Sequence, residues 1–141
     1  MSTRVGHCLC GAVTLRVNGH RPKVGACHCQ MCRRWTGAAL FNFVAAPEQV
    51  AFHGPFQAYR SSSFAERAFC RRCGSHLWIR DDGGDFELLP GLFEAAKDFP
   101  LISEVYVDDS LAAVRLEGDH RRVSRAEYES RNPFVAEERL P

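Results

Sequence analysis

Seven cysteines, arranged in three closely spaced groups, are the residues best suited to chemistry in this 141-residue sequence. The groups are the C-x-C pair Cys8 and Cys10, the C-x-C-x-x-C triplet Cys27, Cys29 and Cys32, and the C-x-x-C pair Cys70 and Cys73. Disulfides alone could not use an odd number of thiols, and residues 1–7 lack the apolar core of a secretory signal. We therefore interpret the cysteines as metal ligands of a cytoplasmic protein, because a reducing compartment keeps them as thiols.

The two pairs predict one closed metal site. Residues i and i+2 of an extended segment point the same way, so Cys8 and Cys10 can present both sulfurs to one ion. A C-x-x-C turn brings Cys70 and Cys73 together, and Gly74 suits the positive φ that often follows such a turn. Together these four thiolates would form a tetrahedral structural zinc site.

The triplet predicts a second, open site. Cys27, Cys29 and Cys32 lie within six residues, so one zinc ion can bind all three and keep its fourth position for water or substrate. Two alternatives stay open: Cys27 and Cys29 could pair with the residue-70 knuckle, or a histidine could close the triplet. We expect His28 to point away from its neighbours' ion, and we interpret His76 as an ordinary strand residue.

Arginines flank both groups of ligands. Arg71 and Arg72 are expected to offset the negative charge of the four-thiolate site. Arg33 and Arg34 follow Cys32 directly, where guanidinium groups could either offset charge or bind the carboxylates of an anionic substrate.

Short strands must position these ligands. Val13, Leu15 and Val17 alternate with polar residues, which is typical of a half-buried strand over residues 12–17. Similar patterns predict strands over residues 40–44, 49–53, 56–60, 67–70, 76–80, 86–89, 104–107 and 112–116, with a hairpin turn at 82–85. A capping box at Ser124–Glu127 and the Asn132-Pro133 stop predict one short C-terminal helix. The sequence therefore predicts a mainly β, zinc-stabilised fold.

The length, charge and hydropathy of the chain limit its organisation and partners. With 141 residues and no repeat or linker, the chain is expected to form one zinc-binding domain over 1–141. The formal net charge of +1 gives no electrostatic basis for a nucleic-acid or anionic-membrane partner. No segment has the apolar length of a membrane span.

The cysteine motifs also resemble those of the glutathione-dependent formaldehyde-activating enzyme family, which includes centromere-protein-V-like proteins. The matching segments run from residue 6 to about residue 80 and are Cys8–Val13, Cys27–Arg33, Thr36–Ala39, Tyr59 and Arg67–Ser75. This resemblance implies a β-tent-like fold of folded-over antiparallel sheets. It also implies structural zinc on Cys8, Cys10, Cys70 and Cys73, and catalytic zinc on Cys27, Cys29 and Cys32.

The resemblance further implies a carbon–sulfur lyase that forms S-(hydroxymethyl)glutathione from formaldehyde and glutathione. Our leading hypothesis is therefore zinc-dependent carbon–sulfur chemistry on a small thiol such as glutathione. The alternative is a zinc-stabilised binding or scaffold domain without catalysis. The oligomeric state and the physiological substrate are not predicted from the sequence.

Overall fold

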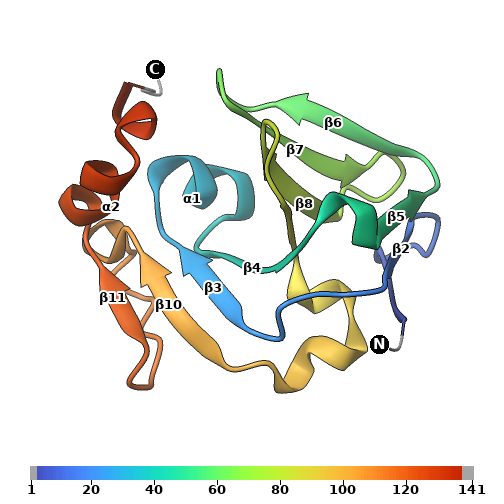
Figure 1. Ribbon diagram of the computed structural model, residues 1–141, viewed down its shortest axis with the longest axis horizontal. Helices are drawn as coiled ribbons and strands as arrows, with labels where there is room; N and C mark the ends of the chain where they lie inside the picture. Colours follow the sequence, from blue (N-terminus) through green and yellow to red (C-terminus); the bar gives the residue numbers. More distant parts are fainter. Residues whose placement is uncertain (1–2, 138–141) are drawn as a thin grey trace. The chain divides into compact units, whose positions relative to one another are not determined.

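The computed structural model describes residues 3–137, and the chain folds as two compact units. Unit 1 comprises residues 1–23 and 42–99, and unit 2 comprises residues 24–41 and 100–141. The described residues form 11 strands and two short α-helices, which confirms the predicted mainly β class (Figure 1). The single domain over 1–141 stays a prediction.

Unit 1 is built from antiparallel strands. Its strands are β1 (Arg4–His7), β2 (Thr14–Val17), β5 (Val50–His53), β6 (Phe56–Arg60), β7 (Ala65–Cys70), β8 (His76–Asp81) and β9 (Phe86–Leu88), together with most of β4 (Leu40–Ala45). Strands β1, β2 and β5 form one sheet, while β4, β9, β8, β7 and β6 follow one another in a second. Three 3₁₀ helices complete the unit: η1 (Pro47–Gln49), η2 (Pro90–Leu92) and η3 (Glu94–Asp98).

The core of unit 1 is apolar and rich in aromatic rings. Phe43 and Leu88 are fully buried and lie opposite each other on β4 and β9. Phe52 stacks on Trp78 with ring centroids 5.6 Å apart, which joins β5 to β8. Cys8 and Cys70 are also fully buried and belong to this core, so the first cysteine group is anchored in the packed interior.

Unit 2 is a small parallel sheet with two α-helices. It contains β3 (Val24–Cys27), α1 (Gln30–Thr36), β10 (Leu101–Val105), η4 (Val107–Asp109), β11 (Arg121–Val123), α2 (Arg125–Arg131) and η5 (Pro133–Glu137). Strand β10 pairs in parallel with both β3 and β11, and the three lie side by side in Figure 1. The antiparallel pairing expected throughout thus holds in unit 1 only. Parallel pairing becomes possible because more than seventy residues separate β3 from β10.

One predicted strand is wrong. Residues 112–116 form no strand and are mostly exposed, and the nearby strand is β11 instead. The Arg122 guanidinium donates hydrogen bonds to the carbonyl oxygens of Leu116 and Gly118, at 2.9 and 3.0 Å. These hydrogen bonds stabilise the segment as a loop, so its apolar residues do not pair with a neighbouring strand.

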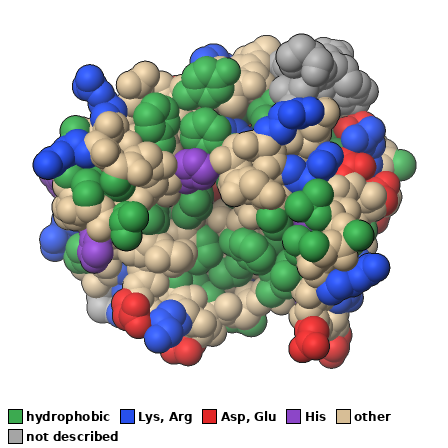
Figure 2. Space-filling model, turned by 180° about the vertical axis from the view of Figure 1, so that it is seen from behind, with side chains coloured by type: hydrophobic (Ala, Val, Ile, Leu, Met, Phe, Trp, Pro, Cys, Tyr) green, Lys and Arg blue, Asp and Glu red, His purple; other side chains and the backbone are tan. Residues whose placement is uncertain are grey.

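The surface carries charges of both signs. On the face shown in Figure 2, basic and acidic side chains are both present, and neither kind gathers into one continuous patch. Within residues 3–137, no helix has the length and apolar character needed to cross a bilayer.

Candidate metal centres

The first candidate centre contains four cysteines of unit 1. The sulfur atoms of Cys8, Cys10, Cys70 and Cys73 all lie within 4.8 Å of one another. The Sγ atoms of Cys8 and Cys10 are 3.6 Å apart, and those of Cys10 and Cys70 are 3.9 Å apart. Four Zn–S bonds of about 2.3 Å in a tetrahedron place the sulfurs about 3.8 Å apart. A disulfide would need about 2.0 Å, so the spacing fits a tetrahedral metal.

Two tight turns of the backbone create this spacing. Gly11 and Gly74 have φ values of 81° and 78°, a left-handed conformation that favours glycine, and each directly follows a cysteine of this centre. The prediction for Gly74 is confirmed. Backbone N–H groups of Val13 and Arg72 donate to the sulfurs of Cys8 and Cys70, at 3.3 and 3.4 Å. Each turn therefore directs both its cysteines and its N–H donors toward the same point.

Ser75 connects the two turns. Its hydroxyl oxygen accepts a hydrogen bond from the Leu9 N–H at 3.0 Å and lies 3.2 Å from the Cys73 sulfur. Hydrogen bonds from Ser75 lower the pKa of the Cys73 thiol to about 5. The thiolate, which is the form that binds metal, is thus favoured at neutral pH.

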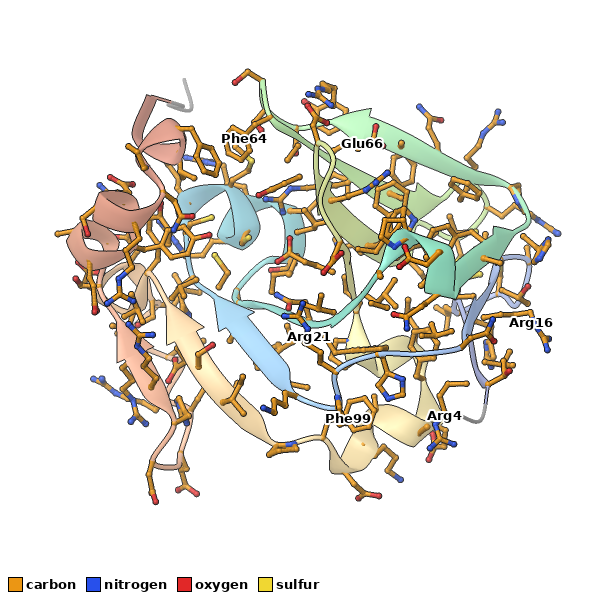
Figure 3. All side chains as sticks on the ribbon, in the orientation of Figure 1. Arg4, Arg16, Arg21, Phe64, Glu66 and Phe99 are labelled. Atoms are coloured by element: carbon orange, nitrogen blue, oxygen red, sulfur yellow. The ribbon has the colours of Figure 1, made fainter. Side chains whose placement is uncertain are left out.

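The second candidate centre contains three cysteines of unit 2. Cys27 ends β3, Cys29 is the N-cap of α1, and Cys32 is a buried residue in the first turn of that helix. The three sulfur atoms lie within 4.8 Å of one another, and sulfur atoms are seen beside α1 in Figure 3. The Cys29 sulfur also accepts a hydrogen bond from the Cys32 N–H at 3.3 Å. A strand end and a helix start thus bring the triplet together.

The electrostatics of the triplet favour a bound cation. Hydrogen bonds from Cys29 and Cys32, together with burial and their nearby charges, raise the pKa of Cys27 well above its ordinary value. Three thiolates cannot share so small a space without a positive charge among them. Among the described residues, no histidine or carboxylate joins this group of ligand atoms. The residues present therefore fit a metal that has three protein ligands and one free position.

His28 lies between two of these cysteines but faces the other way. Its side chain is 1 % exposed, and its Nε2 lies 2.7 Å from Oε1 of Glu104 on β10. The His28 side chain therefore points away from the neighbouring cysteine sulfurs, as the sequence predicted. The sequence analysis did not identify Glu104. Its position as an inward-facing carboxylate in a short apolar strand could have indicated it.

Tyr106 is a second residue that sequence reasoning missed. It follows β10, is buried, and has a φ of 57°, which is uncommon for a residue with a bulky side chain. Its hydroxyl donates to Oε2 of Glu129 on α2 at 2.9 Å. Burial and that bond raise the pKa of Tyr106, and the negative charges of Glu129, Cys29 and Cys27 add to the shift.

The two arginines that follow the triplet occupy different environments. Arg33 is half-buried, and its Nε donates to the carbonyl oxygen of His28 at 3.2 Å. Arg34 is exposed on α1. Arg33 thus has a structural contact within the loop, whereas Arg34 has its guanidinium in solvent.

The fold and the two sites define a class of protein: a small, mainly β protein with two cysteine groups that could each hold a metal ion. The glutathione-dependent formaldehyde-activating enzyme family matches residues 3–109 of the sequence, which is well over half of its length. The chain therefore belongs to this family. The match extends about thirty residues beyond the segments recognised by motif, and it includes β9 and β10.

Two relatives and one solved structure support this placement. An uncharacterised lyase of Schizosaccharomyces pombe is 33% identical over 107 residues, which cover 74% of this chain and 78% of the relative. A candidate glutathione-dependent formaldehyde-activating enzyme of Halomonas elongata is 35% identical over 86 residues, covering 54% of this chain and 55% of the relative. The crystal structure of a Rhodobacter sphaeroides protein has a similar fold, with a TM-score of 0.56 and 22% identity, over 69% of this chain and 98% of that one.

Proposed function

We propose that this protein is a zinc-dependent carbon–sulfur lyase that forms or cleaves the adduct between a small thiol, such as glutathione, and formaldehyde. Family membership supports the reaction class. The observation that carries the proposal is the triplet of cysteines in unit 2, which offers one ligand fewer than a tetrahedral ion needs. In this proposal, Cys27, Cys29 and Cys32 hold a catalytic zinc, and the four cysteines of unit 1 hold a structural one.

The proposed reaction is the addition of a thiol to a carbonyl carbon. In the direction of synthesis, the substrate thiol loses its proton and its sulfur bonds to the carbonyl carbon. The carbonyl π bond then breaks, and the oxygen takes up a proton to give the hydroxymethyl group. A zinc ion at the triplet would supply a Lewis-acidic site that stabilises the substrate as its thiolate at neutral pH.

Residues of the chain supply the positions for this reaction. Cys29 and Cys32 are fixed by the start of α1, and together with Cys27 they would hold the ion that supplies the Lewis-acidic site. The exposed Arg34 could bind a carboxylate of glutathione, while Arg33 keeps the loop in shape through the His28 carbonyl. A cytoplasmic location is part of the proposal, because none of the seven cysteines, all among the described residues, is in a disulfide.

The proposal can be tested by removing one ligand of the triplet. We expect the Cys29→Ala variant to keep its fold and one zinc ion per chain but to form the adduct only at the spontaneous rate. The Glu127→Gln variant is the matched control, because Glu127 is a partly exposed residue of α2 whose carboxylate pairs with Arg121 and Arg131 on the surface. Product formation from glutathione and formaldehyde is followed by NMR. Catalysis by Cys29→Ala at the wild-type rate would overturn the proposal, and so would a wild-type protein that binds one zinc ion.

A further inference from the structure

A buried polar cluster of unit 2 has no part in the mechanism described above. Its centre is Glu104, which is 3 % exposed. One carboxylate oxygen of Glu104 lies 2.7 Å from Nε2 of His28, and the other contacts Nε2 of His120 and lies 3.4 Å from Nε of Arg122. The side chains of His28 and His120 are 1% and 2% exposed, so the three groups are shielded from water. Such a cluster is costly to bury and needs a reason.

The register of the parallel strands explains how the cluster forms. Glu104 on β10 lies opposite Ala26 on β3 and opposite Arg122 on β11. His28 lies two residues beyond Ala26, and His120 lies two residues before Arg122. Side chains two residues apart in extended chain share a face. All four polar residues therefore gather over the same face of the sheet.

The carboxylate also fixes the orientation of both imidazole rings. Burial raises the pKa of Glu104, but hydrogen bonds with His120 and His28 outweigh that effect, so the pKa is lowered overall. An ionised carboxylate only accepts hydrogen bonds. The Nε2 atoms of His28 and His120 that face it are therefore placed as hydrogen-bond donors.

His28 is held at three points. Its ring donates to Glu104, its backbone N–H donates to the Val105 carbonyl at 3.1 Å, and its carbonyl accepts from Arg33 at 3.2 Å. Since His28 lies between Cys27 and Cys29, these three contacts fix the direction in which both neighbouring sulfurs point. The Glu104 contact is the strongest of the three, because it is buried and charge-assisted.

We propose that Glu104 is a positioning residue of the open metal site, which it organises through His28, with His120 and Arg122 holding the carboxylate in place. The inference rests on the proposed function, in that the triplet of cysteines is taken to bind the exchangeable ion. Partners behind metal ligands commonly change metal affinity 10- to 100-fold when they are removed. The carboxylate acts here on the loop that carries the ligands rather than on a ligand itself.

The test is a metal-affinity measurement on full-length variants. Glu104→Gln keeps the shape of the side chain but places an amide N–H₂ against one of the two imidazole donors. We expect this variant to bind the second zinc ion with an affinity about 10- to 100-fold weaker than that of wild type, as measured by competition with a chelator. The ion in the four-cysteine site should be retained. With cobalt in the second site, the thiolate-to-metal absorption bands should shift, which reports on ligand geometry independently of catalysis.

Two further variants complete the experiment. His120→Gln removes one partner at the far side of the carboxylate, so we expect a smaller weakening, and this variant carries the test if Glu104→Gln does not fold. Glu127→Gln, on the surface of α2, should match wild type. The inference is overturned if folded Glu104→Gln or His120→Gln binds the second ion with wild-type affinity and an unchanged cobalt spectrum. A wild-type protein that binds a single ion would overturn the proposed function first, so the two failures are distinguishable.

Discussion

Neighbouring groups shift the pKa values of individual side chains in this protein. Ser75 makes Cys73 more acidic, whereas the crowded thiols make Cys27 less so. A third case lies outside the metal centres, on the sheet of unit 1. Arg67 on β7 and Glu87 on β9 both lie opposite Ile79 on β8, so the two side chains share a face of that sheet.

The free energy of unfolding should depend on pH through the Glu87 carboxyl. Burial and the charge of Asp81, opposed by Arg67, raise the pKa of Glu87 from its ordinary value of 4.5 to about 7. The folded protein then binds more protons than the unfolded chain between these two pH values, so this carboxyl lowers stability as pH rises through that window.

We expect Glu87→Gln to remove this loss and to stabilise the protein by about 1–3 kcal/mol at pH 8, with little gain at pH 5. Urea unfolding at both pH values measures the difference. Glu48→Gln is the control, since Glu48 is an exposed carboxyl. An equal effect of the Glu87 substitution at pH 5 and pH 8 would contradict the assigned titration.

At the scale of helices and strands, sequence patterns predicted the strands whose apolar and polar residues alternate but missed elements that carry no such pattern. Alternation found β2, β4 and β8, and the capping motif found α2, whose N-cap Ser124 accepts the Glu127 N–H at 3.2 Å. Strands β3 (Val-Gly-Ala-Cys) and β11 (Arg-Arg-Val) lack the alternation of apolar and polar residues that marked β2, which is also only four residues long. Helix α1 was missed because a cysteine, rather than serine or aspartate, caps its start.

In the candidate site, residues close together in the sequence could be predicted, whereas partners far away in the sequence could not. Spacing was enough to predict that each pair and the triplet could bind an ion, because each of these groups is local. Spacing left open which groups share one ion, and the fold brings Cys8 and Cys10 together with Cys70 and Cys73. The partners Glu104 and Tyr106 lie more than seventy residues from the triplet along the chain. They reach it only through the pairing of β10 with β3, which no local pattern contains.

The end of α1 offers a test of how the helix supports the triplet. Gly37 caps the helix with a φ of 97°, and its N–H donates to the Arg33 carbonyl at 2.7 Å. A Cβ at this position would meet no neighbouring atom, so any cost of Gly37→Ala comes from the left-handed backbone alone. We expect a loss of about 1 kcal/mol in the free energy of unfolding.

The control for this change is Gly91→Ala, because Gly91 also has open space around its Cβ position but an ordinary φ. Its effect should stay within about 0.5 kcal/mol. Both variants are compared by urea unfolding with zinc in excess. Equal losses in the two variants would show that the left-handed cap of α1 is not what the alanine disturbs.

At the scale of the whole molecule, we expect the two candidate centres to have different structural roles. The four-cysteine centre joins the segment before β2 to the end of β7, some sixty residues away in the chain. Two of its ligands, Cys8 and Cys70, are fully buried in the core of unit 1. The triplet lies within six residues, so an ion there closes only a short loop. Loss of the first ion should therefore cost far more stability than loss of the second.

Stepwise removal of metal should separate these roles. A mild chelator is expected to take one zinc ion per chain, abolish adduct formation and leave the circular dichroism spectrum unchanged. Removal of the second ion should then unfold unit 1, because four thiolates, two of them buried in the core, would lose the cation that neutralises them. Matched variants assign the ions: Cys32→Ser should keep one ion and a melting temperature close to wild type, whereas Cys73→Ser should melt many degrees lower. If Cys32→Ser were the less stable of the two, the triplet rather than the four-cysteine centre would hold the structural ion.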